Sequence, residues 1–262
     1  MQLTEEQTQR YSRNIILPQI GGVGQTELLK SNVLIIGAGG LGSPAALYLA
    51  AAGVGHLGII DSDHVELSNL QRQILHTTKD LDQPKTESAE RTLNELNPDV
   101  EITPHNQRLT ADNAKNVIND YDFIIDGTDN LASKFLIADA CHFSNKPYSH
   151  AGVLGWEGQT ITVIPGQTTC YRCIFAYPPP EDAVPSCAQA GVLGVVPGVF
   201  GTIQAAEAVK YLLPQGRLLT DRLLTYNALN MSFRTVPVQK NTECPLCGEE
   251  PEIKELHLPR TA

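Results

Sequence analysis

Three charged residues that are far apart in the sequence, Arg72, Lys85 and Asp129, have side chains suited to a phosphate chain. Two cations can neutralise phosphate oxygens, and a carboxylate can hold the Mg²⁺ that bridges them. Alone, each residue has an ordinary explanation, because a loop arginine is usually solvated and an aspartate at a strand end can cap the next helix. Together around one glycine loop, they indicate phosphoryl or nucleotidyl transfer better than hydride transfer.

The glycine loop has the sequence GAGGLG and lies between a short apolar run and an alanine-rich segment. Gly37, Gly39 and Gly42 have the GxGxxG spacing, which combines a tight turn, close backbone approach to a phosphate, and close packing of helix on strand. The helix that follows would direct free N–H groups at the anion. Asp61 ends the next apolar run, roughly 20 residues beyond the loop, where a carboxylate can hold ribose hydroxyls. These features predict a nucleotide site.

The segment 126–130 (DGTDN) supplies two carboxylates and an amide, which are oxygen ligands suited to Mg²⁺. The same segment can instead form a turn and cap the next helix through Asp129 or Asn130. Lys85 follows Pro84 at the start of an expected helix, so its amine would join the free backbone N–H groups of an anion site. Two cations beyond the glycine loop favour a triphosphate over a dinucleotide.

Four of the six cysteines form two CxxC pairs, Cys170 with Cys173 and Cys244 with Cys247. Four thiolates suit tetrahedral zinc, and they would tie the end of the chain to a proline-rich loop in a closed structural site. Free or redox-active cysteines are the alternative. Cys187 differs, because it stands in a polar loop ahead of a glycine-rich segment, where a thiol can be accessible and reactive.

The elements that must position these residues alternate between strand and helix, which predicts a parallel, doubly wound α/β sheet. In such a sheet, the loops that follow the strands meet at one edge, where ligands bind. We expect strands at 33–36, 57–60, 100–103 and 121–126, and helices from Gly42, at 84–96, at 111–118 and at 131–144. Beyond these lie antiparallel strands at 148–164 and 223–238, a long crossing loop at 165–186, and a helix at 201–213.

Bulk composition excludes several classes of protein. The 262 residues, 42% of them hydrophobic, indicate a globular chain. There is no apolar run near the roughly 18 residues of a membrane span and no charged-then-apolar leader, so we expect a cytoplasmic protein with no membrane partner. The formal net charge of -10 argues against nucleic acid as a partner, since that normally requires a basic face.

Taken together, these residues resemble the ThiF/MoeB/HesA family, bacterial relatives of ubiquitin-activating enzymes, over nearly the whole chain. The resemblance rests on Arg10-Tyr11-Ser12-Arg13, the GAGGLG loop, the run 68–72, Pro84-Lys85, Thr128-Asp129-Asn130, Cys187 and the two cysteine pairs. The segment 45–109 is most similar to ThiF. The resemblance implies one Rossmann-like domain over 1–262 with a mostly parallel sheet. Its nucleotide-binding part would be 30–150, and its antiparallel, carrier-docking, crossover-loop and zinc-binding part would be 151–262.

The family's activity is ATP- and Mg²⁺-dependent adenylation of the C-terminal glycine of a ubiquitin-like sulfur carrier. That carrier is ThiS for ThiF, in thiamine thiazole biosynthesis, or MoaD for MoeB, in molybdopterin synthesis. The resemblance implies that a separate protein donates sulfur, that Arg13 enters the partner subunit's site in a homodimer, and that Cys187 takes part in a covalent carrier intermediate. The nucleotide-binding residues expected are Gly37, Gly39, Gly40, Gly42, Asp61, Ser68, Asn69, Arg72, Gln73, Lys85, Asp129 and Asn130, with Mg²⁺ on Asp129.

Three other functions fit parts of the sequence. A relative that activates a tRNA-borne carboxylate is opposed by the acidic balance and the cysteine pairs. An NAD-dependent dehydrogenase is allowed by the loop and Asp61, but it has no use for Arg72, Lys85 or four thiolates. A zinc-stapled scaffold would bind nucleotide and dock the carrier without activating it.

Overall fold

The computed structural model describes residues 2–180, 183 and 187–256, and this part of the chain contains one eight-stranded sheet in the order β3-β2-β1-β4-β5-β6-β7-β8. Neighbours from β3 to β5 run parallel, and those from β5 to β8 run antiparallel. The strands are β1 (Asn32–Ile36), β2 (His56–Asp61), β3 (Glu101–Asn106), β4 (Phe123–Asp126), β5 (Tyr148–Leu154), β6 (Glu157–Val163), β7 (Arg222–Asn227) and β8 (Ser232–Pro237).

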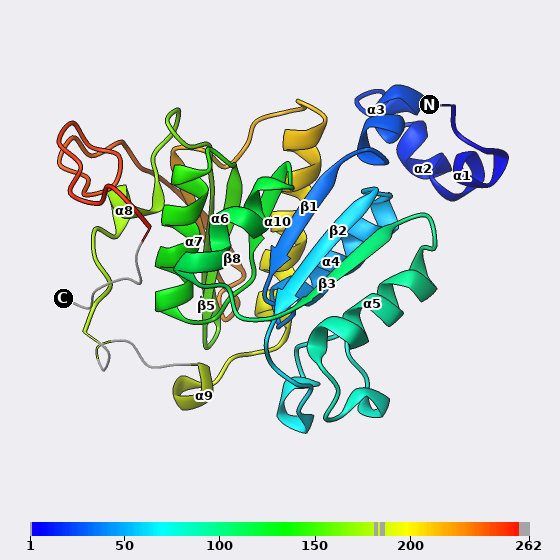
Figure 1. Cartoon of the computed structure of the whole chain (residues 1–262), viewed down its shortest axis with the longest axis horizontal. Helices are drawn as coiled ribbons and strands as arrows, with labels where there is room; N and C mark the ends of the chain where they lie inside the picture. Colours follow the sequence, from blue (N-terminus) through cyan, green and yellow to red (C-terminus); the bar gives the residue numbers. More distant parts are fainter. Residues whose placement is uncertain (1, 181–182, 184–186, 257–262) are drawn as a thin grey trace.

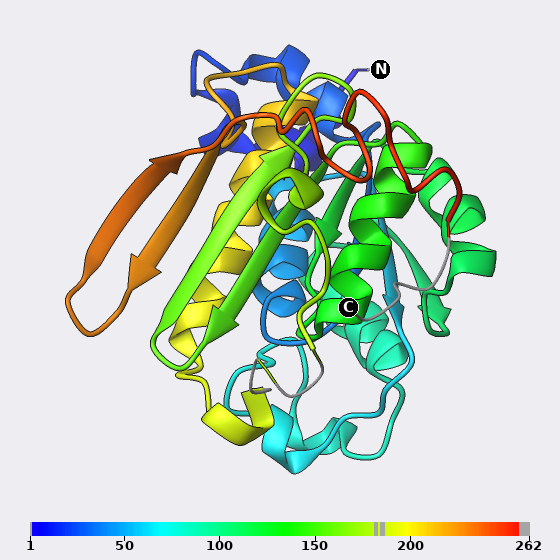
Figure 2. The same cartoon turned by 90° about the vertical axis from the view of Figure 1, so that its left-hand side faces the viewer.

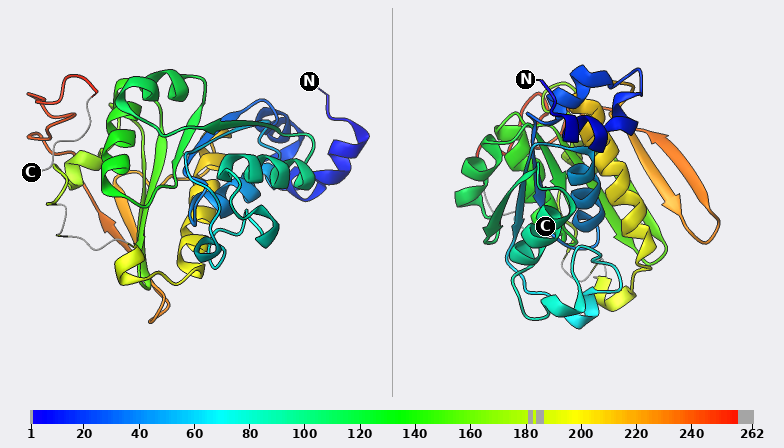
Figure 3. Two further views of the ribbon diagram at one scale, coloured as in Figure 1. Left: turned by 60° about the horizontal axis from the view of Figure 1, so that its bottom comes forward. Right: turned by 90° about the vertical axis from the view of Figure 1, so that its right-hand side faces the viewer.

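Helices cover both faces of the parallel half, with α4, α5 and α10 on one face and α6 and α7 on the other (Figures 1 and 3). The α-helices are α1 (Glu5–Arg10), α2 (Ser12–Ile15), α3 (Gly21–Leu28), α4 (Gly42–Ala52), α5 (Lys85–Leu96), α6 (Ala111–Asn119), α7 (Leu131–Phe143), α8 (Tyr171–Ile174), α9 (Cys187–Ala190) and α10 (Val195–Leu212). Short 3₁₀ turns, η1 (Leu67–Asn69) and η2 (Thr78–Asp80), lie in the loop after β2. Within the described part of the chain, no helix is both long enough and apolar enough to span a bilayer.

Strand β1 contains a continuous apolar run because both of its faces are buried. Val33 and Ile35 belong to the core beneath α4 and α10, whereas Leu34 and Ile36 belong to the core beneath α6 and α7. Successive side chains of a strand point to opposite faces, so a strand covered on both sides needs apolar residues at every position.

Strand β1 pairs with β2 on one side and β4 on the other, so the strand order reverses between β1 and β4. Ligands of doubly wound sheets bind in the crevice outside the strand ends at such a reversal. Gly37 follows β1 and Gly127 follows β4, which brings the glycine loop and the 126–130 segment together. The predicted doubly wound sheet is confirmed.

The antiparallel half of the sheet is also confirmed. The structure differs from the prediction in the start of one helix and in a short helix within the crossing loop. Strands β7 and β8 form a hairpin that projects at the end of the sheet (Figure 2). The helix predicted from residue 201 begins at Val195, because Pro197 lies in its first turn, where proline is tolerated. The crossing loop, predicted as irregular, contains the short helix α8 between two of the cysteines.

Candidate active site

A cavity of about 130 Å³ lies at the strand-order reversal; we call it the first cavity. Nine of the predicted nucleotide residues line it, namely Gly37, Gly39, Gly40, Asp61, Arg72, Gln73, Lys85, Asp129 and Asn130. They come from the end of β2, from the loops after β1, β2 and β4, and from the start of α5. The other three predicted residues, Gly42, Ser68 and Asn69, are not among its lining residues.

The glycine loop has the close approaches that its spacing predicts. A Cβ on Gly42 would lie 1.8 Å from the carbonyl oxygen of Gly37, and one on Gly37 would lie 2.9 Å from that of Gly127. Gly37 also has φ +96°, a conformation that other residues rarely adopt. Gly39 is different, since the nearest atom to its Cβ position is Gln73 Nε2 at 3.7 Å, which leaves its backbone open to the cavity.

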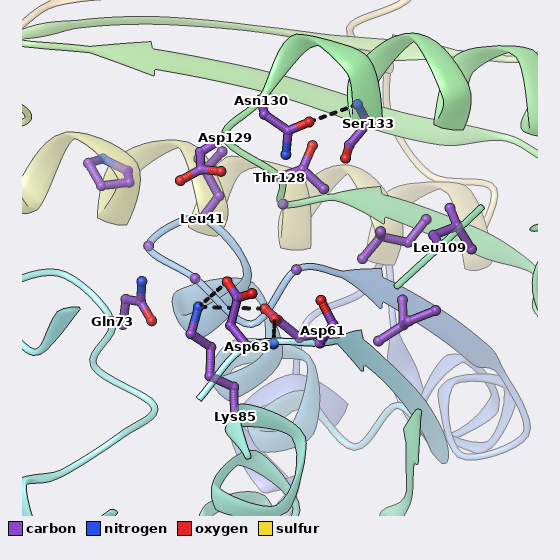
Figure 4. A pocket seen from close by; sticks show the side chains of 18 of the residues that line it. Leu41, Asp61, Asp63, Gln73, Lys85, Leu109, Thr128, Asp129, Asn130 and Ser133 are labelled. Atoms are coloured by element: carbon purple, nitrogen blue, oxygen red, sulfur yellow. Dashed lines mark hydrogen bonds and ion pairs between the residues drawn. The ribbon is translucent and has the colours of Figure 1, made fainter. Parts of the chain in front are cut away.

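Lys85 and Asp61 lie on one side of the first cavity, as Figure 4 shows. Lys85 is 6% exposed, and its Nζ donates to Asp63 Oδ2 at 3.0 Å and lies 4.0 Å from Asp61 Oδ2. Asp61 is fixed by backbone donors, with Ala38 N at 2.8 Å from Oδ2 and the N–H of Asp63 at 2.9 Å from Oδ1. The side chain of Asp61 therefore has one orientation, and Lys85 holds a charge at the cavity wall.

Arg72 reaches the cavity from the loop that follows β2. Its Nη1 donates to the carbonyl oxygen of Ser68 at 3.1 Å, and its backbone N–H donates to that of Asn69 at 3.0 Å. The Asn69 side chain accepts the N–H of Glu66, closing a tight turn. Ser68 and Asn69 thus shape the turn that presents Arg72.

The 126–130 segment divides its tasks in a way that the sequence left open. Asn130 caps α7, since its Oδ1 accepts the N–H of Ser133 at 2.9 Å, which leaves Asp129 on the cavity wall (Figure 4). The suggestion that Asp126 is a Mg²⁺ ligand is not supported. Asp126 is fully buried and already bonded to Lys134 and His150, because it ends a strand inside the sheet rather than in the loop.

Some residues in or next to the first cavity were not predicted from the sequence. His76 is buried, and its ring bridges Ser88 Oγ and the carbonyl oxygen of Ala38, at 2.9 Å each, so it anchors the glycine loop to α5. Burial lowers its pKa, with a smaller contribution from the charge of Lys85. The loop after β3 adds Gln107, Arg108 and Leu109 to the cavity lining. Only the folded sheet brings this loop beside Asp61.

A larger cavity, about 690 Å³, adjoins the first; we call it the second cavity. Thr128, Asp129, Asn130 and Val153 line both. Its floor is one face of the antiparallel strands, made of two cross-strand rows. These rows are Gly152, Gln159, Thr225 and Arg234, and Leu154, Glu157, Asn227 and Ser232. The start of α7 and Pro178, Pro179 and Pro180 complete the lining.

A buried charge cluster of Asp126, Lys134 and His150 borders the second cavity, whose lining includes Lys134 and His150. Lys134 Nζ lies 3.3 Å from Asp126 Oδ2 and donates to the carbonyl oxygen of Ala151 at 2.6 Å. His150 Nδ1 lies 2.7 Å from the same Asp126 oxygen. Burial raises the pKa of Asp126, but the charge of Lys134 and the His150 hydrogen bond outweigh it and bring the pKa to about 2. Burial and Lys134 lower the pKa of His150, so Asp126 is ionised and His150 is neutral at pH 7.

The four cysteines of the CxxC pairs come together as predicted. The Sγ atoms of Cys170, Cys173, Cys244 and Cys247 all lie within 4.8 Å of one another. Four of the six separations are 3.3 to 3.6 Å, close to the edge of about 3.8 Å expected for a tetrahedron with Zn–S bonds of about 2.3 Å. Two sulfurs are buried and two are partly buried, and the donor set fits structural zinc.

Two expected site residues lie elsewhere. Arg13 is in α2, where its neighbour Asn14 bonds to the carbonyl oxygen of Ala52 at the C-terminal end of α4. The first cavity lies at the opposite end of that helix, roughly 16 Å away at 1.5 Å per residue. Cys187 begins α9, but its side chain lies outside the described part of the structure.

Comparisons with known proteins agree with this site. The model of the ThiF family matches residues 11–246. The "Sulfur carrier protein adenylyltransferase" of Thermus thermophilus is 45% identical over 261 residues, which are 98% of this chain and 96% of that protein. The "SAMP-activating enzyme E1" of Haloferax volcanii is 47% identical over 249 residues, 95% of this chain and 92% of that protein. The "Adenylyltransferase and sulfurtransferase MOCS3" of Drosophila sechellia is 46% identical, and this chain spans 56% of its length.

Solved structures share the fold. E. coli MccB with MccA-N7isoASN superposes with a TM-score of 0.80 at 23% identity, covering 92% of this chain and 75% of that chain. PaaA superposes with a TM-score of 0.74 at 23% identity, covering 91% and 76%. Since identity is low, the likeness supports the architecture alone.

Proposed function

The chain belongs to the ThiF family and is an adenylyltransferase, and from that premise we propose that it activates the C-terminal glycine carboxylate of a ubiquitin-like sulfur carrier protein. ATP is the second substrate, and the products are an acyl-adenylate and pyrophosphate. The observation that carries the proposal is the junction of the two cavities at Thr128, Asp129 and Asn130. A nucleotide in the first cavity and a peptide in the second would meet there.

The chemistry is a displacement at the α-phosphorus of ATP. A carboxylate oxygen of the carrier forms the new P–O bond, while the bond from the α-phosphorus to the bridging oxygen breaks, and its electron pair leaves with pyrophosphate. The carboxylate is ionised at neutral pH, so no base is needed. The protein contributes alignment and neutralisation of charge.

Four of the residues that line the first cavity have a task in this proposal. Asp61, held by two backbone donors, accepts ribose hydroxyls. Lys85 and Arg72 neutralise phosphate oxygens, and Lys85 exchanges Asp63 for a phosphate when ATP binds. Asp129 holds Mg²⁺, because Asn130 is occupied as a cap.

The second cavity would take the extended tail of the carrier. Residues 30–150 then serve the nucleotide, and residues 151–262 serve the carrier and hold zinc. We propose a ThiS-like carrier, which belongs to thiamine thiazole synthesis, with a MoaD-like carrier of molybdopterin synthesis as the alternative. Sulfur comes from a separate protein, and Arg13 completes the partner subunit's site in a homodimer. Cys187 forms a covalent link to the carrier when its thiolate bonds to the carbonyl carbon of the acyl-adenylate, the bond from that carbon to the phosphate oxygen breaks, and AMP leaves.

The test is ATP–pyrophosphate exchange in the presence of Mg²⁺, measured in parallel with ThiS and MoaD from the same cell. We expect the exchange rate to be higher with one of the two carriers than with the other. Arg72→Ala and Lys85→Ala should each lower the rate by about 100-fold, since each removes a charge from the transition state. Lys115→Ala, an exposed change on α6, is the matched control.

Two outcomes contradict the proposal. If neither carrier supports exchange, the chain does not adenylate a carrier of either type. If the carrier binds and ATP binds but no adenylate forms, the chain is a docking scaffold. Unfolding of Arg72→Ala or Lys85→Ala in step with lost activity would mean a structural role for that residue.

A further inference from the structure

His150 is a polar side chain in the lining of the second cavity that the adenylation chemistry does not use. It lies on β5 directly beside Asp126, the last residue of β4, and is 2% exposed. Its partner Asp126 is two residues before Thr128, so His150 lies near the 128–130 segment where the two cavities join. A peptide bound in this cavity with its end near that segment would therefore lie close to His150.

The hydrogen bond to Asp126 fixes the tautomer of His150. Because the Asp126 carboxylate is ionised, it accepts a hydrogen from Nδ1 across the 2.7 Å contact. A neutral imidazole with hydrogen on Nδ1 has a lone pair on Nε2. His150 is therefore a hydrogen-bond acceptor at Nε2.

The floor of the cavity places that acceptor. Gly152 follows His150 on the same face of β5, and a Cβ built on Gly152 would lie 3.9 Å from His150 Nε2. Both residues line the cavity, and the next atom near that Cβ position is Gln159 Cγ at 4.0 Å. The missing side chain at Gly152 thus leaves room for a peptide backbone to lie against Nε2.

The two cationic side chains among the described residues that line the second cavity, Lys134 and Arg234, are not placed to anchor a peptide beside His150. Lys134 is engaged by Asp126 and by the carbonyl oxygen of Ala151. Arg234 lies on β8, at the far end of the row that begins with Gly152. Because Lys134 already has these two partners, it is not free to pair with the carboxylate of a bound peptide, and the peptide would need another anchor.

We propose that His150, oriented by Asp126, accepts a hydrogen bond from a backbone N–H of the carrier's extended C-terminal peptide and so positions its carboxylate. This inference rests on the proposed function, because it assumes that the peptide in the second cavity is the substrate of adenylation. His150 is a positioning residue and takes no part in bond making.

The test separates the carrier's KM from that of ATP in the exchange assay, using whichever of ThiS and MoaD the unmodified protein activates. His150→Phe removes the acceptor and should raise the carrier KM about tenfold, the scale of one buried hydrogen bond, with the ATP KM unchanged. His150→Gln, whose amide oxygen can replace Nε2, should restore most of the affinity. Gly152→Ala should raise the carrier KM similarly, because its methyl group covers Nε2.

Controls make each outcome decisive. Gly22→Ala, on α3 and with no atom within 4 Å of the new methyl group, should leave both KM values unchanged. If the unmodified protein exchanges with neither carrier, the proposed function fails and not this inference alone. If it exchanges while Gly152→Ala and His150→Phe keep its carrier KM, the inference is wrong. If His150→Phe unfolds, Gly152→Ala decides, since it removes no buried polar group.

Discussion

Gly42 and Gly39 belong to one loop but have opposite surroundings. We predict that Gly42→Ala destabilises the fold by more than about 3 kcal/mol, beyond ordinary overpacking, because its methyl group would lie 1.8 Å from a backbone carbonyl that cannot move away. Gly39→Ala should change the free energy of unfolding by less than about 1 kcal/mol, since its nearest neighbour is 3.7 Å away.

Denaturant unfolding and ATP binding together check this contrast. Gly39→Ala should weaken ATP binding at least about tenfold while the protein stays folded, because the methyl group stands where a phosphate must approach. Equal stability losses in the two variants would contradict our account of the loop.

At the residue level, the sequence predicted which charged residues line the first cavity better than it predicted which residues form hydrogen bonds with one another. It indicated Arg72, Lys85 and Asp129 because their types are rare choices for one loop cluster, and all three line the first cavity. It did not separate the cap Asn130 from Asp129, since either side chain can cap a helix. His76 and His150 gave no signal, because an isolated histidine acquires its role from contacts made at long range.

At the level of elements, the four-cysteine cluster ties α8 to the segment near the end of the chain. We predict one zinc ion per chain, and we expect Cys173→Ser to lose zinc and lower the melting temperature by several degrees. ATP affinity should change little, because none of the four cysteines is among the described residues that line either cavity.

Metal analysis and thermal unfolding measure this effect. Cys141→Ala is the matched control, because Cys141 is buried in α7 outside the cluster and its loss should leave zinc content unchanged. Zinc-free protein with an unaltered melting temperature would argue for free cysteines at this site.

The elements themselves were largely predictable from the sequence. Strands β1 and β2 and helix α5 lie within a residue or two of their predicted bounds, because period and helix-start signals are local. The start of α10 was missed, since its first turn contains Pro197 and Gly198, whose helical state depends on packing against α4. Strand at 223–238 was predicted from the pattern, but the β7–β8 hairpin within it and the cavity that it lines were not.

At the level of the whole molecule, Arg13 lies at the far end of α4 from its own first cavity. If two chains share their sites, Arg13→Ala and Lys85→Ala should each be inactive alone. Mixing the two unfolded variants and refolding them together should then restore about a quarter of the exchange activity, because half the dimers are mixed and each has one intact site.

Refolding two samples of Lys85→Ala together is the control and should restore nothing. A mixture that stays inactive, with mixed dimers verified by mass, would mean that Arg13 acts within its own chain or not at all.

The buried histidines make stability depend on pH. Burial lowers the pKa values of His76 and His150 below the ordinary 6.5, so below that pH the unfolded chain binds protons that the folded chain does not. The contribution of these histidines to the free energy of unfolding is therefore fully present above pH 6.5. It decreases as the pH falls below that value, by up to about 1.4 kcal/mol per pH unit for each group.

Denaturant unfolding at pH 7.5 and 5.5 tests this dependence. His76→Gln should be less stable at both values but should show a smaller difference between them, because one of the titrating groups is gone. Asp126 adds nothing in this range, since its pKa of about 2 places its own loss of stability below pH 4. Equal stability at the two pH values would contradict the assignment of neutral, buried rings.

The two cavities share Thr128, Asp129, Asn130 and Val153, but among the described residues those of β6, β7 and β8 line the second cavity and not the first. Surface changes on the antiparallel half can therefore accumulate without disturbing the groups around the phosphate chain. A protein built this way can acquire a new protein substrate through a few substitutions on one hairpin and keep its nucleotide chemistry intact. Exchanging β7 and β8 between members of the family is therefore a way to engineer a change of protein substrate.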